Sequence, residues 1–223
     1  MSWNLRQGAV EASLGPFTAV LAPDKPQLGL EILRHSDLLG HAFSVSVPTE
    51  FSFTVEEAYQ RGNDFIVRFD QSGADTFAFQ LDWRILANCS TPGIELWLSV
   101  QTDDLDSSPV LAIASDLKSE GWTGYNNTQL LNEADEPTQT SGPNDEPPAA
   151  LVSNSNEISA LWLIEPTDQQ HVQCEETGKP TLKQIRLFDH FMEKGVIRRA
   201  RMRCHLSETP FSGRHSSVVP AAY

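Results

Sequence analysis

The chain has 223 residues, a 39% apolar content and a formal net charge of −14 at neutral pH. The ordinary apolar content excludes a wholly disordered chain, and the length suits one large all-β domain. The acidic balance disfavours binding of nucleic acid or anionic membranes over the whole surface, because the long-range field of the protein repels phosphate.

Apolar and polar residues alternate with a period of two through most of the chain, which predicts half-buried β-strands. In chain order, strands are expected at 17–21, 28–34, 43–47, 51–55, 65–69, 77–85, 94–100, 110–115, 158–165, 172–175 and 196–206. A turn signal, Thr91-Pro-Gly, separates 77–85 from 94–100, so these two strands are expected to form an antiparallel hairpin. About ten strands with polar turns predict an antiparallel β-sandwich or a curved double sheet.

The clearest strands show which side chains should enter the core. In 77–85 the residues expected to face inward are Phe77, Phe79, Leu81, Trp83 and Ile85. In 94–100 they are Ile94, Leu96, Leu98 and Val100. The side chains between them are polar, apart from Ala78 and Trp97, so one face of each strand is expected to lie outside the core.

We expect residues 1–208 to form a single β-sandwich domain. Residues 133–149 lack apolar periodicity and are rich in Pro, Asp and Glu, which predicts a flexible loop. Residues 209–223 are expected to form a poorly ordered tail.

One α-helix is expected near the C-terminus, from Leu182 to Glu193. An apolar stripe at helical spacing is formed by Leu182, Ile185, Phe188 and Met192. Thr181 suits the start of this helix, and Lys194-Gly195 suits its end.

The positive charge of the chain is concentrated in this expected helix and the strand that follows it. Residues 179–203 hold eight basic and two acidic side chains, a net charge of +6, whereas the 178 preceding residues hold 7 basic and 27 acidic side chains, a net charge of −20. In the strand 196–206, alternation places Arg199, Arg201 and Arg203 on one face.

The three arginines allow two interpretations. Same-face residues on a strand lie about 6.5–7 Å apart, so the guanidinium groups could bind a row of anionic groups on a ligand or partner. Alternatively, acidic side chains of neighbouring strands pair with them. No aromatic residue alternates with the arginines, which disfavours binding of single-stranded nucleic acid.

Three aromatic residues suggest a different ligand. Trp97 lies on the polar face of its strand, and Trp122 and Tyr125 belong to a Gly-Trp-Thr-Gly-Tyr segment. Exposed rings with polar neighbours could stack on a sugar, and a nearby carboxylate pair would then suit glycoside chemistry. Alternatively, both faces of the sheet are covered and Trp97 belongs to a second core.

Metal or cofactor sites are not expected. His35, Asp37 and His41 are ligand types at a spacing that matches no zinc signature, and Asp103–Asp106 lacks the glycine and glutamate of a helix-loop-helix calcium site. We expect surface or turn roles for both groups. Three cysteines without a Cys-x-x-Cys spacing predict buried thiols.

Two stretches resemble a family of bacterial, chiefly planctomycete, proteins for which no activity is established. The first runs from Tyr59 to Val67 and continues in Asp82-Trp-Arg, and the second runs from Leu187 through Glu193 to Arg201. The resemblance implies a bacterial cytoplasmic protein and supplies no catalytic residue. The first residues show no signal-peptide pattern, which also predicts a cytoplasmic location.

Together these patterns predict a binding or assembly protein without catalysis. No nucleophile elbow, P-loop, dinucleotide fingerprint or His-Glu-x-x-His motif occurs. The expected ligand or partner is anionic and contacts Arg199, Arg201 and Arg203. The alternatives are a carbohydrate-binding or carbohydrate-active sandwich that uses Trp97, Trp122 and Tyr125, and a homo-oligomer in which the basic strand meets an acidic neighbour.

Overall fold

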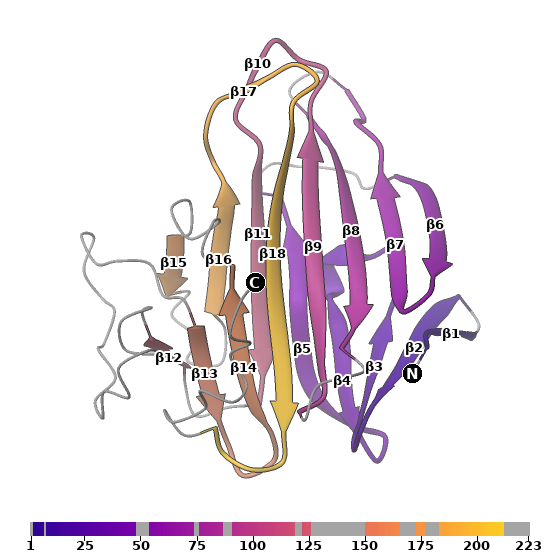
Figure 1. Ribbon diagram of the computed structural model, residues 1–223, viewed down its shortest axis with the longest axis vertical. Helices are drawn as coiled ribbons and strands as arrows, with labels where there is room; N and C mark the ends of the chain where they lie inside the picture. Colours follow the sequence, from indigo (N-terminus) through magenta and orange to yellow (C-terminus); the bar gives the residue numbers. More distant parts are fainter. Residues whose placement is uncertain are drawn as a thin grey trace.

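The computed structural model describes residues 2–6, 8–47, 54–73, 76–86, 91–118, 122–125, 150–165, 173–176 and 183–211. These residues form two eight-stranded antiparallel sheets that pack face to face (Figure 1). Among them no helix is long and apolar enough to span a membrane.

The sheet at the back of Figure 1 is called sheet A. Its strands, in spatial order, are β1 (Asn4–Arg6), β2 (Ala9–Leu14), β3 (Phe17–Leu21), β4 (Leu30–Arg34), β5 (Asp37–Ser46), β11 (Val110–Leu117), β16 (Lys183–Phe188) and β15 (Gln173–Glu176). A single 3₁₀ turn, Pro26–Leu28, precedes β4. Sheet A supplies one wall of the core.

The sheet at the front of Figure 1 is called sheet B. Its strands, in spatial order, are β12 (Trp122–Tyr125), β13 (Ala150–Asn154), β14 (Ser159–Ile164), β18 (Ile197–Ser207), β9 (Gly93–Gln101), β8 (Ala78–Ile85), β7 (Asp64–Phe69) and β6 (Val55–Arg61). A small ribbon of β10 (Asp106–Ser107) and β17 (Met192–Glu193) extends beyond the sheets.

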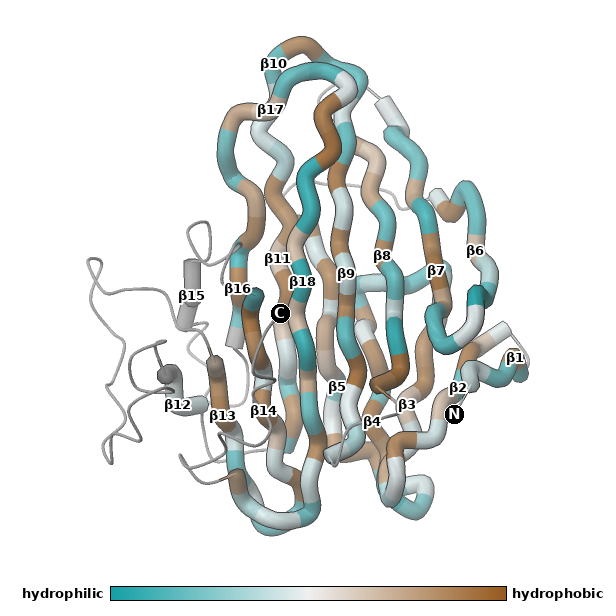
Figure 2. Tube along the Cα trace, viewed as in Figure 1, coloured by the Kyte–Doolittle hydropathy of each residue, from teal (hydrophilic) through white to brown (hydrophobic). Residues whose placement is uncertain are grey.

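The main core lies between the sheets and is built by the expected alternation. All nine inward-facing residues predicted for β8 and β9, from Phe77 to Val100, are buried. Phe43 of β5 links the sheets, because its ring stacks on Trp162 of β14 at 5.2 Å and lies 6.1 Å from Trp83 of β8. Figure 2 shows hydrophobic and hydrophilic residues alternating along β8, β9 and β18.

The expected helix at Leu182–Glu193 is wrong. Ile185 and Leu187 of β16 enter the core and Arg186 lies between them, so the segment follows a period of two. Pairing on both sides, with β11 and β15, favours the strand over the helical stripe. The strand ends where Phe188 and Asp189 take positive φ angles of 74° and 41°.

Other expectations about the strands are confirmed. β8 and β9 form the antiparallel hairpin, and most of the other predicted strands appear with boundaries shifted by a few residues. His35, for which a turn role was expected, and Ser36 form a two-residue turn between β4 and β5 in which both have positive φ, as a type I′ turn requires. The predicted loop at 133–149 lies outside the described residues.

The first part of the predicted tail packs on the sheet. Phe211 is buried on the outer face of sheet B, against Val152 of β13 and Leu161 and Leu163 of β14. Its backbone N–H donates to Asn154 Oδ1, and Asn154 Nδ2 donates to its carbonyl oxygen. Residues beyond Phe211 lie outside the described part.

Candidate functional site

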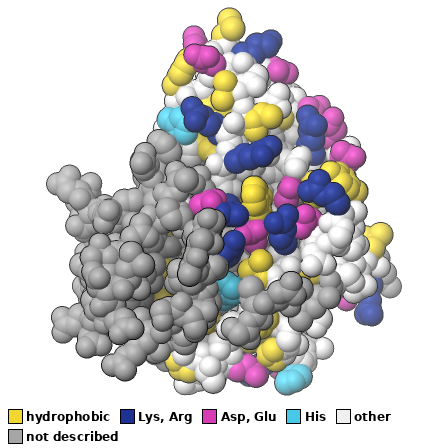
Figure 3. All heavy atoms as spheres, viewed as in Figure 1, with side chains coloured by type: hydrophobic (Ala, Val, Ile, Leu, Met, Phe, Trp, Pro, Cys, Tyr) yellow, Lys and Arg dark blue, Asp and Glu magenta, His cyan; other side chains and the backbone are white. Residues whose placement is uncertain are grey.

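The outer face of sheet B, away from the main core, carries a row of charged residues that crosses four strands. Asp64 of β7 lies opposite Arg84 of β8, Arg84 opposite Glu95 of β9, and Glu95 opposite Arg203 of β18. Directly opposed residues in an antiparallel sheet are close enough for their side chains to interact. Figure 3 shows positive and negative side chains gathered over the middle of this face.

Glu95 is the centre of this row. Its carboxylate is 2% exposed and accepts a hydrogen bond from Arg203 Nε at 2.6 Å and one from the Trp97 indole N–H, also at 2.6 Å. Arg84 Nη1 contacts the same carboxylate at 3.4 Å. Arg201 Nε lies 3.9 Å from it as well. A buried carboxylate is stable only when it is paired and hydrogen-bonded, so Glu95 and these partners form one structural unit.

Asp64 of β7 lies at one end of this row of charged residues. Arg84 donates two hydrogen bonds to it, from Nε at 2.7 Å and from Nη2 at 3.0 Å. These hydrogen bonds lower the pKa of Asp64 below its ordinary value of 3.8, against the opposing effect of burial. The bidentate contact fixes the guanidinium group of Arg84 in one orientation.

Trp97 is held in place on the same face by arginine side chains. The guanidinium carbon of Arg201 lies over its ring at 4.9 Å from the centroid, and that of Arg84 lies at 5.7 Å. Arg201 donates from Nε to Glu165, the residue after β14, at 2.8 Å, and a second bond runs from its Nη2 to the same carboxylate. The ring of Trp97 is therefore packed between charged groups.

The three arginines of β18 share one face, as predicted, but their environments differ. Arg201 and Arg203 are each 15% exposed and pair with Glu165 and Glu95. Arg199 is exposed, and no described residue forms an ion pair or hydrogen bond with it. The structure therefore pairs two of the three arginines internally and leaves the third open to the solvent.

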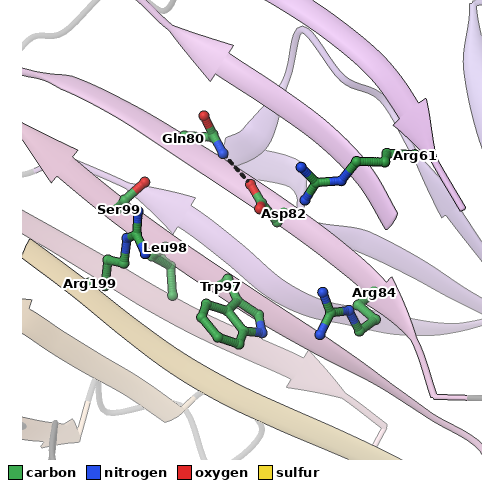
Figure 4. A pocket seen from close by; sticks show the side chains of 8 residues that line it. All are labelled: Arg61, Gln80, Asp82, Arg84, Trp97, Leu98, Ser99 and Arg199. Carbon is green, nitrogen blue, oxygen red and sulfur yellow. Dashed lines mark hydrogen bonds between the residues drawn. The ribbon is translucent and has the colours of Figure 1, made fainter. Parts of the chain in front are cut away.

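Arg199 borders a depression of about 250 Å³ on this face. The depression is lined by Arg61, Gln80, Asp82, Arg84, Trp97, Leu98, Ser99 and Arg199. Figure 4 shows Arg199 across from Arg61 and Arg84, with Asp82 between Arg199 and Arg61 and Trp97 between Arg199 and Arg84. Gln80 donates a hydrogen bond of 2.6 Å to Asp82. The depression thus presents positive groups around one carboxylate.

The other predicted aromatic residues lie far from this depression. β12, which carries Trp122 and Tyr125, is separated from β9 by β13, β14 and β18, a distance of about 19 Å at the usual strand spacing. Trp122 lies against Trp162 of the core at 5.5 Å between ring centroids. The side chain of Tyr125 lies outside the described part. Trp97 and Trp122 therefore do not share a cleft.

His205 continues the arginine face of β18 but is buried, at 2% exposure. Its Nδ1 lies 3.3 Å from the carbonyl oxygen of Thr91, and no described residue bonds to its Nε2. Gly93 makes room for the ring, because a Cβ atom there would lie 2.9 Å from Nδ1. Burial lowers the pKa of His205 below its ordinary value of 6.5.

The buried imidazole predicts a pH dependence of stability. The unfolded chain binds a proton at His205 below about pH 6.5, whereas the folded chain binds it only at a lower pH, so stability is lost as the pH falls below 6.5. We expect His205→Gln to flatten the slope of unfolding free energy against pH between 6.5 and 5 by up to about 1.4 kcal/mol per pH unit. Urea unfolding across this range measures the slope, and equal slopes for both proteins would contradict the prediction.

Cys204 is buried in the core, and burial raises the pKa of its thiol to about 12, which makes it unreactive. Among the described residues, no group of three or more His, Cys, Asp or Glu side chains could hold a metal ion.

Comparisons with known proteins give distant similarities of shape. No family model matches the sequence, and no curated protein matches it. A heparinase III structure aligns with a TM-score of 0.49 and 8% identity over 95% of this chain, which spans 36% of that protein. A galactose mutarotase-like protein from Clostridium acetobutylicum aligns with a TM-score of 0.45 and 7% identity, over 93% of this chain and 98% of that one. At these values neither likeness bears on function.

Sequence reasoning identified Arg199 and Trp97 but missed the rest of the depression. Gln80, Asp82 and Arg84 are the polar positions of β8, and the alternation had placed them on the outer face. The hairpin with β9 puts Asp82 directly opposite Trp97 and Gln80 opposite Ser99. Continuing the register of that predicted hairpin would have located these residues beside Trp97.

Proposed function

We propose that this chain is a non-catalytic binding protein that binds an anionic group at Arg199, on the outer face of sheet B. The observation that carries the proposal is the contrast along β18. Arg201 and Arg203 are used to pair with buried or half-buried carboxylates, whereas Arg199 is exposed, lacks a described partner and borders a depression.

The surroundings of Arg199 suit an anion. Its guanidinium group can donate two parallel hydrogen bonds to a carboxylate, sulfate or phosphate. Ser99, directly opposite on β9, and Gln80, opposite Ser99 on β8, offer neutral donors in the same depression. Arg84 is held by Asp64 and Glu95, so its side chain keeps one position at the edge of the depression.

The proposal is tested by removing Arg199 beside a matched control. Arg198 is the neighbouring arginine of the same strand, is also exposed, and does not line the depression. Titration of sulfate and of galacturonate, followed by the NMR signal of the Trp97 indole N–H, should give weak, saturable binding to the native protein. We expect Arg199→Ala to weaken it about tenfold, as loss of a charge-assisted contact does, and Arg198→Ala to change it less than twofold.

If both substitutions weaken anion binding equally, the loss reflects the net charge of the protein and not a site at Arg199, and the proposal is overturned. Native-like affinity in Arg199→Ala would place the anion elsewhere. If the Trp97 indole signal of the native protein does not change with either anion, the proposed binding function is wrong.

A carbohydrate ligand is the second candidate, and the position of Asp82 favours it. This carboxylate lines the depression beside Trp97, and carboxylates commonly accept hydrogen bonds from hydroxyl groups. Stacking of a sugar on Trp97 is less favoured, because Arg201 already lies over the ring.

Three other expectations stay predictions from the sequence. They are a cytoplasmic location, homo-oligomer formation and membership of the planctomycete family.

A further inference from the structure

Two adjoining depressions on the outer face of sheet B form one groove. The second, of about 70 Å³, is lined by Arg68, Ala78, Phe79, Gln80, Ser99, Val100, Gln101, Ile197 and Arg199. It shares Gln80, Ser99 and Arg199 with the larger depression. Along β8 the lining runs from Arg84 to Ala78, about 20 Å at the rise of a strand. This length exceeds a single small anion or one sugar ring.

The charges along the groove are spaced rather than continuous. Arg61 and Arg84 border one end of the groove, and Arg199 lies at the shared middle. Arg68 lies level with Arg199 on the far side of the groove, because Arg68 is opposite Gln80, Gln80 is opposite Ser99, and Ser99 is opposite Arg199. Arg68 pairs with Glu56 at 2.8 Å, but both side chains are 46% exposed. Such a surface pair contributes only about 0–1 kcal/mol, so Arg68 can turn to a ligand at small cost.

Asp82 lies between these arginines and limits the ligand class. Gln80 donates to its Oδ1, and no described residue donates to its other oxygen. A ligand that carries only phosphate groups would be repelled by this carboxylate, whereas a ligand with hydroxyl groups would donate to it. Stacking of nucleic-acid bases is disfavoured, because Trp97 in the groove is already covered by Arg201.

We infer that the groove binds a linear chain of acidic sugars, with one acidic group at Arg199, hydroxyl groups at Asp82 and a further acidic group toward Arg68. This inference rests on the proposed anion site at Arg199 and specifies its ligand. Each contact is weak on an open surface, so affinity depends on occupying several positions at once.

The test compares ligands of graded length and different chemistry by the same indole titration. We expect galacturonate oligomers of two and four units to bind progressively more tightly than the monomer, with a total gain of about tenfold or more. Arg68→Ala should reduce this gain, with Glu56→Ala, which leaves Arg68 in place, as its control. A neutral oligosaccharide of equal length should bind at least about tenfold more weakly than the acidic tetramer.

Inorganic polyphosphate of matched charge tests the role of Asp82. We expect the native protein to prefer the acidic tetramer over polyphosphate, and Asp82→Ala to lower that preference about tenfold, because only the sugar loses a hydrogen bond. Equal or tighter binding of polyphosphate or of a single-stranded oligonucleotide to the native protein would overturn the inference.

The remaining outcomes distinguish failure of this inference from failure of the proposed anion site at Arg199. If affinity does not rise with oligomer length while Arg199→Ala still weakens sulfate binding about tenfold, the acidic-chain ligand is wrong and the anion site stands. If Arg199→Ala leaves all anion binding intact, both are wrong.

Discussion

Replacing Glu95 with alanine should lower the free energy of unfolding by about 3 kcal/mol, although the residue lies outside the main core. Its buried carboxylate accepts hydrogen bonds from Arg203 and Trp97 and contacts Arg84. Its removal takes this acceptor away from all three donors in a partly dehydrated layer. Urea unfolding measures the loss, and the thermal midpoint should fall by about 6–12 °C for a chain of this size.

An exposed ion pair provides the matched control for Glu95. Glu56 pairs with Arg68 at 2.8 Å, a similar distance, but at 46% exposure. Glu56→Ala should therefore change stability by less than about 1 kcal/mol. Glu95→Gln keeps an acceptor oxygen, so its loss of unfolding free energy should lie between those of Glu95→Ala and Glu56→Ala. A loss for Glu95→Ala no larger than that for Glu56→Ala would show that the row does not act as a structural unit.

Reversing the charge of Arg201 should destabilise the protein by about 4 kcal/mol. The substitution Arg201→Glu removes both hydrogen bonds to Glu165 and the guanidinium group that covers Trp97. It also brings a third carboxylate close to Glu95 and Glu165, where like charges repel in a layer that is only 15% exposed at this position. The loss should appear as a lower urea midpoint with an unchanged slope.

Much of the fold follows from local alternation. The inward faces of β8 and β9, and the shared face of Arg199, Arg201 and Arg203, depend only on a period of two and appear as predicted. β16 was not predictable in this way. Ile185 and Phe188 fit a helical spacing, Ile185 and Leu187 fit a strand, and only the pairing with β11 and β15 settles the choice.

The candidate site depends on contacts distant in sequence. Arg203 meets Glu95 across 108 residues, and Arg201 meets Glu165 across 36, because β18 lies between β9 and β14. No local pattern gives that strand order or its register. Because the chain has 30 acidic residues, the sequence predicts that some carboxylates pair with the arginines. It does not predict which carboxylates these are.

The division of roles along β18 is tested most directly by urea unfolding of Arg199→Glu beside Arg201→Glu. Both substitutions reverse the same charge on the same face of one strand. We expect Arg199→Glu to leave the free energy of unfolding within about 0.5 kcal/mol of the native value, and Arg201→Glu to lower it by about 4 kcal/mol. Equal values for the two variants would contradict the assignment of Arg201 to structure and Arg199 to binding.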